Sequence, residues 1–226
     1  SSWTLTALPL FVWMGEILFR TKLSENLFEG LSPWMQKLPG GLIHVNVVGC
    51  ALFAAISGSS AATVATVGKM SIPELRKRNY PEKILLGSLA GSGTLGLLIP
   101  PSIILIIYGV TVQESIAKLF IAGIIPGIMI AIIFMLYVIV WSLINKKIMP
   151  ETFENFSFFE KVKRSRQLIP VILLILGVIG SIYTGIATAT EAASLGVVGA
   201  LILSYFQKSL SLETFKKSLL GATKTS

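Results

Sequence analysis

Five long apolar runs, separated by short basic segments, decide what this chain can fold into. The runs cover residues 3–19, 84–110, 116–144, 168–183 and 187–206. A helix needs roughly 20 predominantly apolar residues to cross the hydrocarbon core of a bilayer, and these runs approach or exceed that length. Because 53% of the residues are hydrophobic and only 13% are charged, the composition lies outside the range of ordinary soluble domains. The sequence therefore predicts an all-α, multi-pass (polytopic) membrane protein.

The basic residues predict the topology. Lys and Arg gather in residues 20–37, 76–83, 146–166 and 208–217, whereas the segments around Glu114 and Gly185 carry few or none. Short loops rich in Lys and Arg stay in the cytoplasm, so we expect the four basic segments on that face. The net charge of +8 does not indicate nucleic-acid binding, because no basic stripe is interleaved with aromatic residues.

The segment 41–72 does not fit a single membrane crossing. Both of its flanks are basic and belong on the same face, and its 32 residues are too few for two full spans. We therefore predict a re-entrant hairpin of two half-helices with its tip at residues 57–60. Irregular backbone at membrane depth occurs where protein or a water-filled cavity satisfies it, and transporters bind ions and substrates at such breaks.

The sequence of the tip, Ser-Gly-Ser-Ser, allows two interpretations. Its hydroxyls and free carbonyls could coordinate a hard cation, and the half-helix N-terminus favours an anion. Small residues such as Ala54 and Gly58 would equally allow two helices to pack closely with no binding role. The hairpin alone does not separate these interpretations.

A second break interrupts the run 84–110, which contains GSGTLGLLIPP at residues 91–101. Proline removes an amide donor and clashes with the preceding turn, and Pro101 biases Pro100 away from helical geometry. We predict a discontinuous helix here. Two breaks close together in the sequence favour one site built from both over packing alone.

Several other polar residues have structural explanations. We expect the single Cys50 to pack in the interior and His44 to be a partnered residue at a helix end, because neither has a second Cys or His with which to bind a metal. We expect Glu16 either to reach the membrane interface or to pair with Arg20, which lies four residues later, the spacing of an ion pair on a helix. Thr188, followed by Glu191, has the spacing of a capping box, which favours a structural cap over a proton relay for Glu191.

Two further segments, 23–38 and 153–167, mix apolar and charged residues and predict interfacial helices on the cytoplasmic surface. Tryptophans favour the membrane interface. We expect this position for the four tryptophans near the ends of the spans: Trp3, Trp13, Trp34 and Trp141.

Four segments resemble, in this order, the large membrane subunit of tripartite ATP-independent periplasmic (TRAP) transporters. They are GGLIHVNVVGCALFAAISGSSAATVATVG, GTLGLLIPPSIILIIYG, KLFIAGIIPG and TATEAAS. The resemblance covers essentially the whole chain. It implies a piece that begins within the second helix of that subunit and ends before the second of two inverted repeats. Residues 1–40 and 146–226 would then belong to a scaffold, and residues 41–145 to half of a transport domain.

The resemblance also implies a function. Members of this family are sodium-coupled secondary importers of organic acids in bacterial inner membranes, and they resemble elevator transporters. A soluble periplasmic binding protein delivers the substrate, and a small membrane subunit, separate or fused, supports the scaffold. The expected substrate is an organic acid anion, with an acidic sugar such as sialic acid preferred to a C4-dicarboxylate.

The site residues follow by position in the family motifs. The resemblance implies sodium ligands at the tip and the break: Ser57, Gly58, Ser59, Ser60, Gly91, Gly93 and Thr94. It leaves Ser57 and Ser102 as candidates to bind the substrate carboxylate. Many relatives carry an aspartate where this chain has Thr63, so dipoles and the substrate would have to balance the sodium charge.

Two other classes of protein are weighed against a transporter. An intramembrane enzyme could use a serine in a membrane-embedded turn, but it needs a base, and the sequence pairs no serine with His44. A purely structural membrane subunit would have continuous helices through Ser57 and Pro100.

Overall fold

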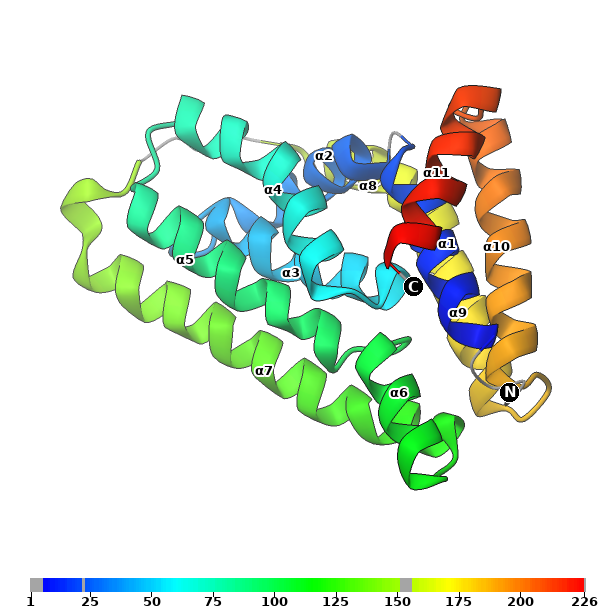
Figure 1. Ribbon diagram of the computed structural model, residues 1–226. Coiled ribbons are helices and arrows are strands. Elements are labelled where there is room, and N and C mark those ends of the chain that lie inside the picture. Colours follow the sequence, from blue (N-terminus) through cyan, green and yellow to red (C-terminus); the bar gives the residue numbers. More distant parts are fainter. Residues whose placement is uncertain (1–5, 22, 151–155, 226) are drawn as a thin grey trace.

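The computed structural model describes residues 6–21, 23–150 and 156–225, and this part of the chain contains helices and no strand. Figure 1 shows two groups of helices that meet at the centre of the molecule. One group holds α3 to α7, and the other holds α1 and α9 to α11, with α2 and α8 lying between them along one side. The all-α class predicted from the sequence is confirmed.

The described residues form eleven α-helices, with short 3-10 turns after α5, α7 and α8. The α-helices are α1 (Ala7–Phe19), α2 (Leu23–Met35), α3 (Ile43–Ser57), α4 (Ser60–Lys77), α5 (Glu82–Gly93), α6 (Ile103–Val112), α7 (Ile116–Ile144), α8 (Phe158–Ser165), α9 (Ile169–Tyr183), α10 (Ala189–Phe206) and α11 (Leu212–Thr225).

Three helical segments of the described chain are long and apolar enough to cross a membrane: Ile116–Ile144, Phe158–Tyr183 and Ala189–Phe206. Only 17% of the most apolar window of Ile116–Ile144 is buried inside the protein, so most of its apolar surface faces outward, as a lipid-facing helix requires. The predicted run 3–19 is a shorter helix of 13 residues, α1, and its first residues lie outside the described part.

Helices α1, α9, α10 and α11 form one bundle, in which α1 packs along both α10 and α11. Trp13 of α1 donates a hydrogen bond from Nε1 to Ser218 Oγ at 3.1 Å, and its ring meets Phe215 edge-on. Trp13 therefore holds α11 against α1, and its place at the membrane interface stays a prediction. The predicted capping box is confirmed, since Thr188 and Glu191 bond reciprocally at the start of α10.

The two predicted interfacial segments form α2 and α8, which pack on each other. Trp34 donates a hydrogen bond to Ser165 Oγ at 2.7 Å, and its ring meets Phe158 edge-on. Residues 153–155 of the predicted segment lie outside the described part. The location of these helices at a membrane surface stays a prediction.

Helix α3 lies at the centre of the other group, and twelve of its 15 residues are buried. It contacts α4, α5 and α7, so its apolar side chains meet partners on every side. Cys50 is fully buried. The His44 Nε2 atom lies 2.8 Å from the Pro39 carbonyl oxygen at the start of α3. Both residues therefore occupy the structural positions predicted for them.

Candidate ion and substrate site

The chain reverses direction between α3 and α4 within two residues. Gly58 has a φ of 60°, in the left-handed region that glycine adopts without a steric penalty. Ser59 is extended and caps α4, because its hydroxyl accepts a hydrogen bond from the Ala62 N–H. A Cβ on Gly49 of α3 would lie 3.5 Å from side-chain atoms of both Val67 and Met70 of α4. The two helices therefore run back alongside each other, and the predicted reversal at Gly58 is confirmed.

The predicted break in the next apolar run is also present. Helix α5 ends at Gly93, a 3-10 turn covers Thr94–Leu97, and α6 begins only at Ile103. Ser102 spans the gap, because its hydroxyl donates a hydrogen bond to the Leu97 carbonyl at 2.7 Å. A structural subunit with continuous helices through Ser57 and Pro100 is therefore excluded.

The tip of the hairpin docks into this break. The Ile103 N–H donates a hydrogen bond to the Gly58 carbonyl at 3.1 Å, and the Ser60 hydroxyl donates one to the Gly93 carbonyl at 2.8 Å. The contact is backbone against backbone, since a Cβ on Gly58 would lie 2.5 Å from the Pro101 oxygen, and one on Gly96 2.9 Å from the Ser60 nitrogen. The two breaks thus form one structural unit, as their proximity in the sequence predicted.

A chain of hydroxyls lies directly behind the tip. The Thr63 hydroxyl donates to the Ser59 carbonyl at 2.7 Å. The Ser57 hydroxyl has one proton and two acceptors within reach, Thr63 Oγ1 at 3.0 Å and the Ser59 carbonyl oxygen at 3.3 Å. The Ser59 N–H donates in turn to Ser57 Oγ at 3.3 Å. Ser57 and Thr63 are both buried. Thr63 therefore supplies neutral hydrogen bonds at the position where the resemblance leads one to expect a carboxylate.

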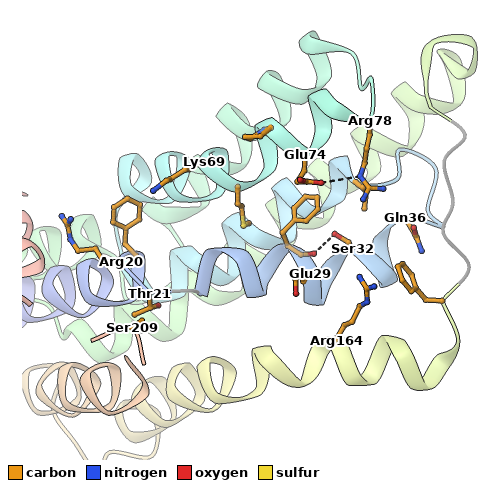
Figure 2. Close-up of a pocket in the computed structure, with 16 residues that line it drawn as sticks. Arg20, Thr21, Glu29, Ser32, Gln36, Lys69, Glu74, Arg78, Arg164 and Ser209 are labelled. Atoms are coloured by element: carbon orange, nitrogen blue, oxygen red, sulfur yellow. Dashed lines mark hydrogen bonds and ion pairs between the residues drawn. The ribbon is translucent and has the colours of Figure 1, made fainter. Parts of the chain in front are cut away.

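Helix α1 closes one side of the tip. A Cβ on Gly15 would lie 2.7 Å from the Ser57 Cα, so α1 and the tip touch through backbone. Beside this contact is a cavity of about 180 Å³, lined by Val12, Gly15, Glu16, Phe19, Ser57, Ser59, Ala61 and Ala62. Phe19 also lines a much larger groove, shown in Figure 2.

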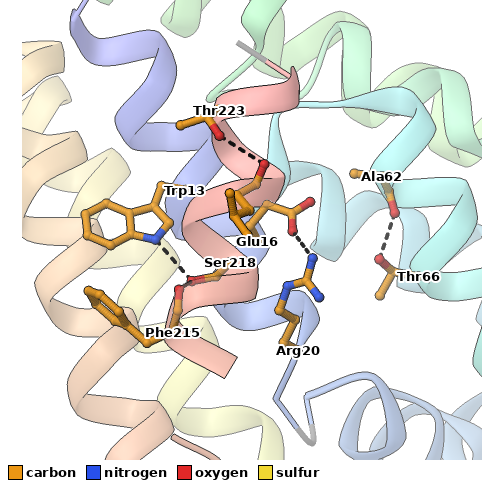
Figure 3. Close-up of polar contacts among 9 residues, drawn as sticks. Trp13, Glu16, Arg20, Ala62, Thr66, Phe215, Ser218 and Thr223 are labelled. Carbon is orange, nitrogen blue, oxygen red and sulfur yellow. Dashed lines mark hydrogen bonds and ion pairs between the residues drawn. The ribbon is translucent and has the colours of Figure 1, made fainter. Parts of the chain in front are cut away.

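Among the described residues, one ion pair lies at this cavity, and it joins Glu16 of α1 to Arg20, the residue that follows α1. Arg20 Nη2 lies 2.9 Å from Glu16 Oε2, which confirms the pair predicted from their spacing. Figure 3 shows both side chains between α11 and α4, where Thr66 donates a hydrogen bond to the Ala62 carbonyl. Glu16 therefore brings a carboxylate to the cavity, and Arg20 balances its charge.

The structure separates the predicted sodium residues into two places. Ser57, Gly58, Ser59 and Ser60 lie at the tip with Gly93, whose missing Cβ makes room for Val64 of α4. The Cα of Gly91 instead faces Phe134 of α7. Thr94 is exposed, and its hydroxyl donates to the Gly91 carbonyl at 2.6 Å. Ser102 is fully buried beside the docked tip.

The oxygens at this junction are of the kind that a hard cation prefers. They are hydroxyls and carbonyls, and a carbonyl that accepts one hydrogen bond retains a second lone pair. Ser92, the residue before Gly93, has a buried hydroxyl with no hydrogen-bond partner among the described residues, so it is a further candidate ligand by its position in the chain. Its position between Gly91 and Gly93 in the sequence could have indicated this role. Nothing in the sequence indicated that Gly15 and Glu16 would line the cavity. The described residues contain no cluster of three or more His, Cys, Asp or Glu that could hold a metal.

The chain is similar to known proteins over essentially its whole length. A family described as "Tripartite ATP-independent periplasmic transporter, DctM component" matches residues 1–226. The C4-dicarboxylate TRAP transporter large permease protein DctM of Pseudomonas aeruginosa is 34% identical over 98% of this chain and 52% of its own length. The isethionate TRAP transporter permease protein of Oleidesulfovibrio alaskensis is 34% identical over 100% and 35%, respectively. The sialic acid TRAP transporter permease protein of Haemophilus influenzae is 33% identical over 98% and 36%. The chain thus spans about half the length of the first relative and about a third of the other two.

Proposed function

Because the chain belongs to the DctM component family of tripartite ATP-independent periplasmic transporters, we propose that it forms part of a membrane permease that imports an organic acid anion together with sodium. Relatives named for C4-dicarboxylates, isethionate and sialic acid support an organic acid anion as the substrate class. Within that class we propose an acidic sugar such as sialic acid, with a C4-dicarboxylate as the alternative. Ser57 is bonded to Thr63 and Ser59 rather than to a histidine, and the relatives are named as permeases, so no enzymatic activity is proposed.

The observation that carries this proposal is the docking of the hairpin tip into the helix break. Broken helices that meet at membrane depth place carbonyls, hydroxyls and helix ends around one point. We propose that sodium binds among Ser57, Gly58, Ser59, Ser60 and Gly93, with Gly91 and Thr94 at the edge of the site and Ser92 as an added ligand. Ser57 and Ser102 would bind the substrate carboxylate.

Sodium coupling has a physical reason at such a site. An anion moved from water into the low-dielectric interior of a membrane loses most of its hydration energy. A sodium ion would supply the positive charge that balances this anion. Because Thr63 and its hydroxyl neighbours are neutral, the substrate carboxylate would in turn balance the charge of the sodium ion. Each ligand would then increase the affinity of the other, and by linkage the two effects are equal in size.

The same proposal includes the movement and the partners. Residues 41–145, with the re-entrant hairpin, would move as half of an elevator-type transport domain against a scaffold formed by residues 1–40 and 146–226. The description of the family as tripartite and periplasmic supports two partners, a periplasmic substrate-binding protein and a small membrane subunit, separate or fused. The proposed location is the bacterial inner membrane.

Uptake by the complete permease tests the coupling. The full-length protein and its partners, reconstituted in proteoliposomes, would be given radiolabelled sialic acid or C4-dicarboxylate with and without an inward sodium gradient. We expect uptake above equilibrium only with the gradient. Equal uptake in both conditions would refute sodium coupling.

The Ser57→Ala variant tests the shared site. Loss of the hydroxyl leaves the Ser59 N–H without a partner and removes the bond between the Ser57 and Thr63 hydroxyls, although Thr63 still donates to the Ser59 carbonyl. A polar group left unsatisfied inside the protein costs about 1–3 kcal/mol. We expect the apparent affinities for sodium and for substrate to fall together, by roughly tenfold. The control is Ser194→Ala, which removes an exposed hydroxyl on α10. A reduced maximal rate with both affinities unchanged would mean that Ser57 does not bind either ligand.

A further inference from the structure

A large groove, separate from the tip cavity, opens between α2, α4 and α8 at the end of α1. Its volume is about 1040 Å³. Figure 2 shows charged side chains from several elements around it: Arg20 follows α1, Lys69 and Arg78 lie along and after α4, and Arg164 lies on α8. Four cationic side chains thus line the groove, together with two carboxylates, Glu29 and Glu74.

The cations of the groove differ in how far they are already neutralised. Arg20 is paired with Glu16 at 2.9 Å, and Arg78 lies 3.9 Å from Glu74. Lys69 and Arg164, by contrast, are exposed and form no ion pair with any described residue. These two positive charges therefore remain available to an anionic ligand.

The rest of the lining is in large part apolar. Phe19 and Phe28 contribute rings from α1 and α2, Leu42 and Met70 contribute aliphatic side chains, and Phe156 lies under the Arg164 guanidinium at 4.3 Å. A small inorganic anion would use only the basic part of such a groove. A molecule with an anionic head and an apolar body would match both parts of the lining.

The elements around the groove also predict on which side of the membrane it lies. Arg20 and α2 belong to the first basic segment of the sequence, and Arg164 belongs to the third, and both segments are predicted on the cytoplasmic face. Basic pockets between helices on that side bind the headgroups of anionic lipids. Guanidinium and ammonium groups are the side chains that bind phosphate most strongly.

We propose that this groove binds the phosphate-bearing headgroup of an anionic phospholipid, with Lys69 and Arg164 as its principal contacts and the lipid chains against the apolar wall. The site lies between α4, in the proposed transport half, and α2 and α8, in the proposed scaffold. A lipid bound there touches both parts. The inference rests on the proposed membrane orientation and not on the identity of the transported anion.

The test uses the full-length permease, delipidated in a neutral detergent. Binding of phosphatidylglycerol is measured by native mass spectrometry for the wild type and for the double variant Lys69→Gln/Arg164→Gln. Each basic residue near an anionic lipid surface increases the affinity about fivefold. Removal of two should therefore weaken lipid binding by roughly 30-fold. The matched control is Lys83→Gln/Lys118→Gln, which removes two exposed charges outside the groove and should leave binding unchanged.

Two further arms identify the source of the phosphate and the location of the lipid. Inorganic phosphate and glycerol 3-phosphate are added in competition, and neither should displace the lipid. A photoactivatable phosphatidylglycerol should label peptides containing residues 19–36 or 69–78 in the wild type, which requires no variant to fold. Equal lipid binding by both double variants, displacement by soluble phosphate, or labelling confined to other peptides would each overturn the proposal. Sodium-dependent uptake is not part of the readout, so these results stand apart from the transport proposal.

Discussion

Replacement of Gly58 by alanine should separate the hairpin tip from the helix break. An L-residue in the left-handed conformation that Gly58 adopts costs about 1–2 kcal/mol. The added Cβ would also lie 2.5 Å from the Pro101 carbonyl oxygen, and forcing atoms into a packed site costs about 1–3 kcal/mol. The docked arrangement should therefore lose about 2–5 kcal/mol, which is a factor of roughly 30 or more in the ratio of docked to undocked tip.

Hydrogen exchange on the full-length permease measures this undocking directly. In the wild type the Ile103 amide is bonded to the Gly58 carbonyl, so we expect peptides that contain Ile103 to exchange faster in Gly58→Ala. The apparent sodium affinity in proteoliposome uptake should fall by a similar factor of roughly 30 or more. Gly87→Ala, in α5, is the control, because a Cβ there would meet no atom within 4 Å and alanine favours a helix over glycine. Unchanged exchange at Ile103, together with unchanged sodium dependence, would refute the docking argument.

Two other changes follow from the same geometry. In Gly15→Val the new side chain would overlap the Ser57 backbone, because even a Cβ would lie only 2.7 Å from the Ser57 Cα. Substrate uptake should therefore fall at least tenfold. The control Gly180→Ala should stay active, since a Cβ there would meet no atom within 4 Å. Thr188→Ala removes the hydroxyl half of the capping box at α10, which should destabilise the permease by about 1 kcal/mol in thermal unfolding without changing sodium affinity; a normal unfolding midpoint would show that the cap is dispensable.

Much of the local structure could be read from the sequence. The runs 116–144, 168–183 and 187–206 form helices because most of their side chains are apolar and no cluster of glycines and prolines like that at residues 91–101 interrupts them. Gly58 marks the first break because glycine adopts a left-handed backbone conformation without penalty. The proline pair marks the second because proline has no backbone N–H to donate. The capping box and the Glu16–Arg20 pair were predictable because they depend on residues three or four positions apart.

The residues of the tip and the break were predictable as two interruptions of helix, but their arrangement was not, and their binding role stays a proposal. Gly91 and Thr94 are within two positions of Gly93 in the sequence, yet they face away from the tip, because neighbouring residues of a helical segment point in different directions. Ser92 was passed over, since a hydroxyl is recognised as unpartnered only when all of its neighbours are placed. The contact of Trp13 with Ser218 was not predictable, because it spans 205 positions of the chain.

The sequence by itself determined that the chain is helical, that it belongs in lipid, and where two of its helices are interrupted. These properties follow from the side chains and backbone preferences of nearby residues. Only the tertiary structure decided that the tip enters the break, that α1 touches Ser57 at Gly15, and that cations from α4 and α8 face one groove. Such contacts depend on how whole helices pack, and packing is set by the fit of surfaces that lie far apart along the chain.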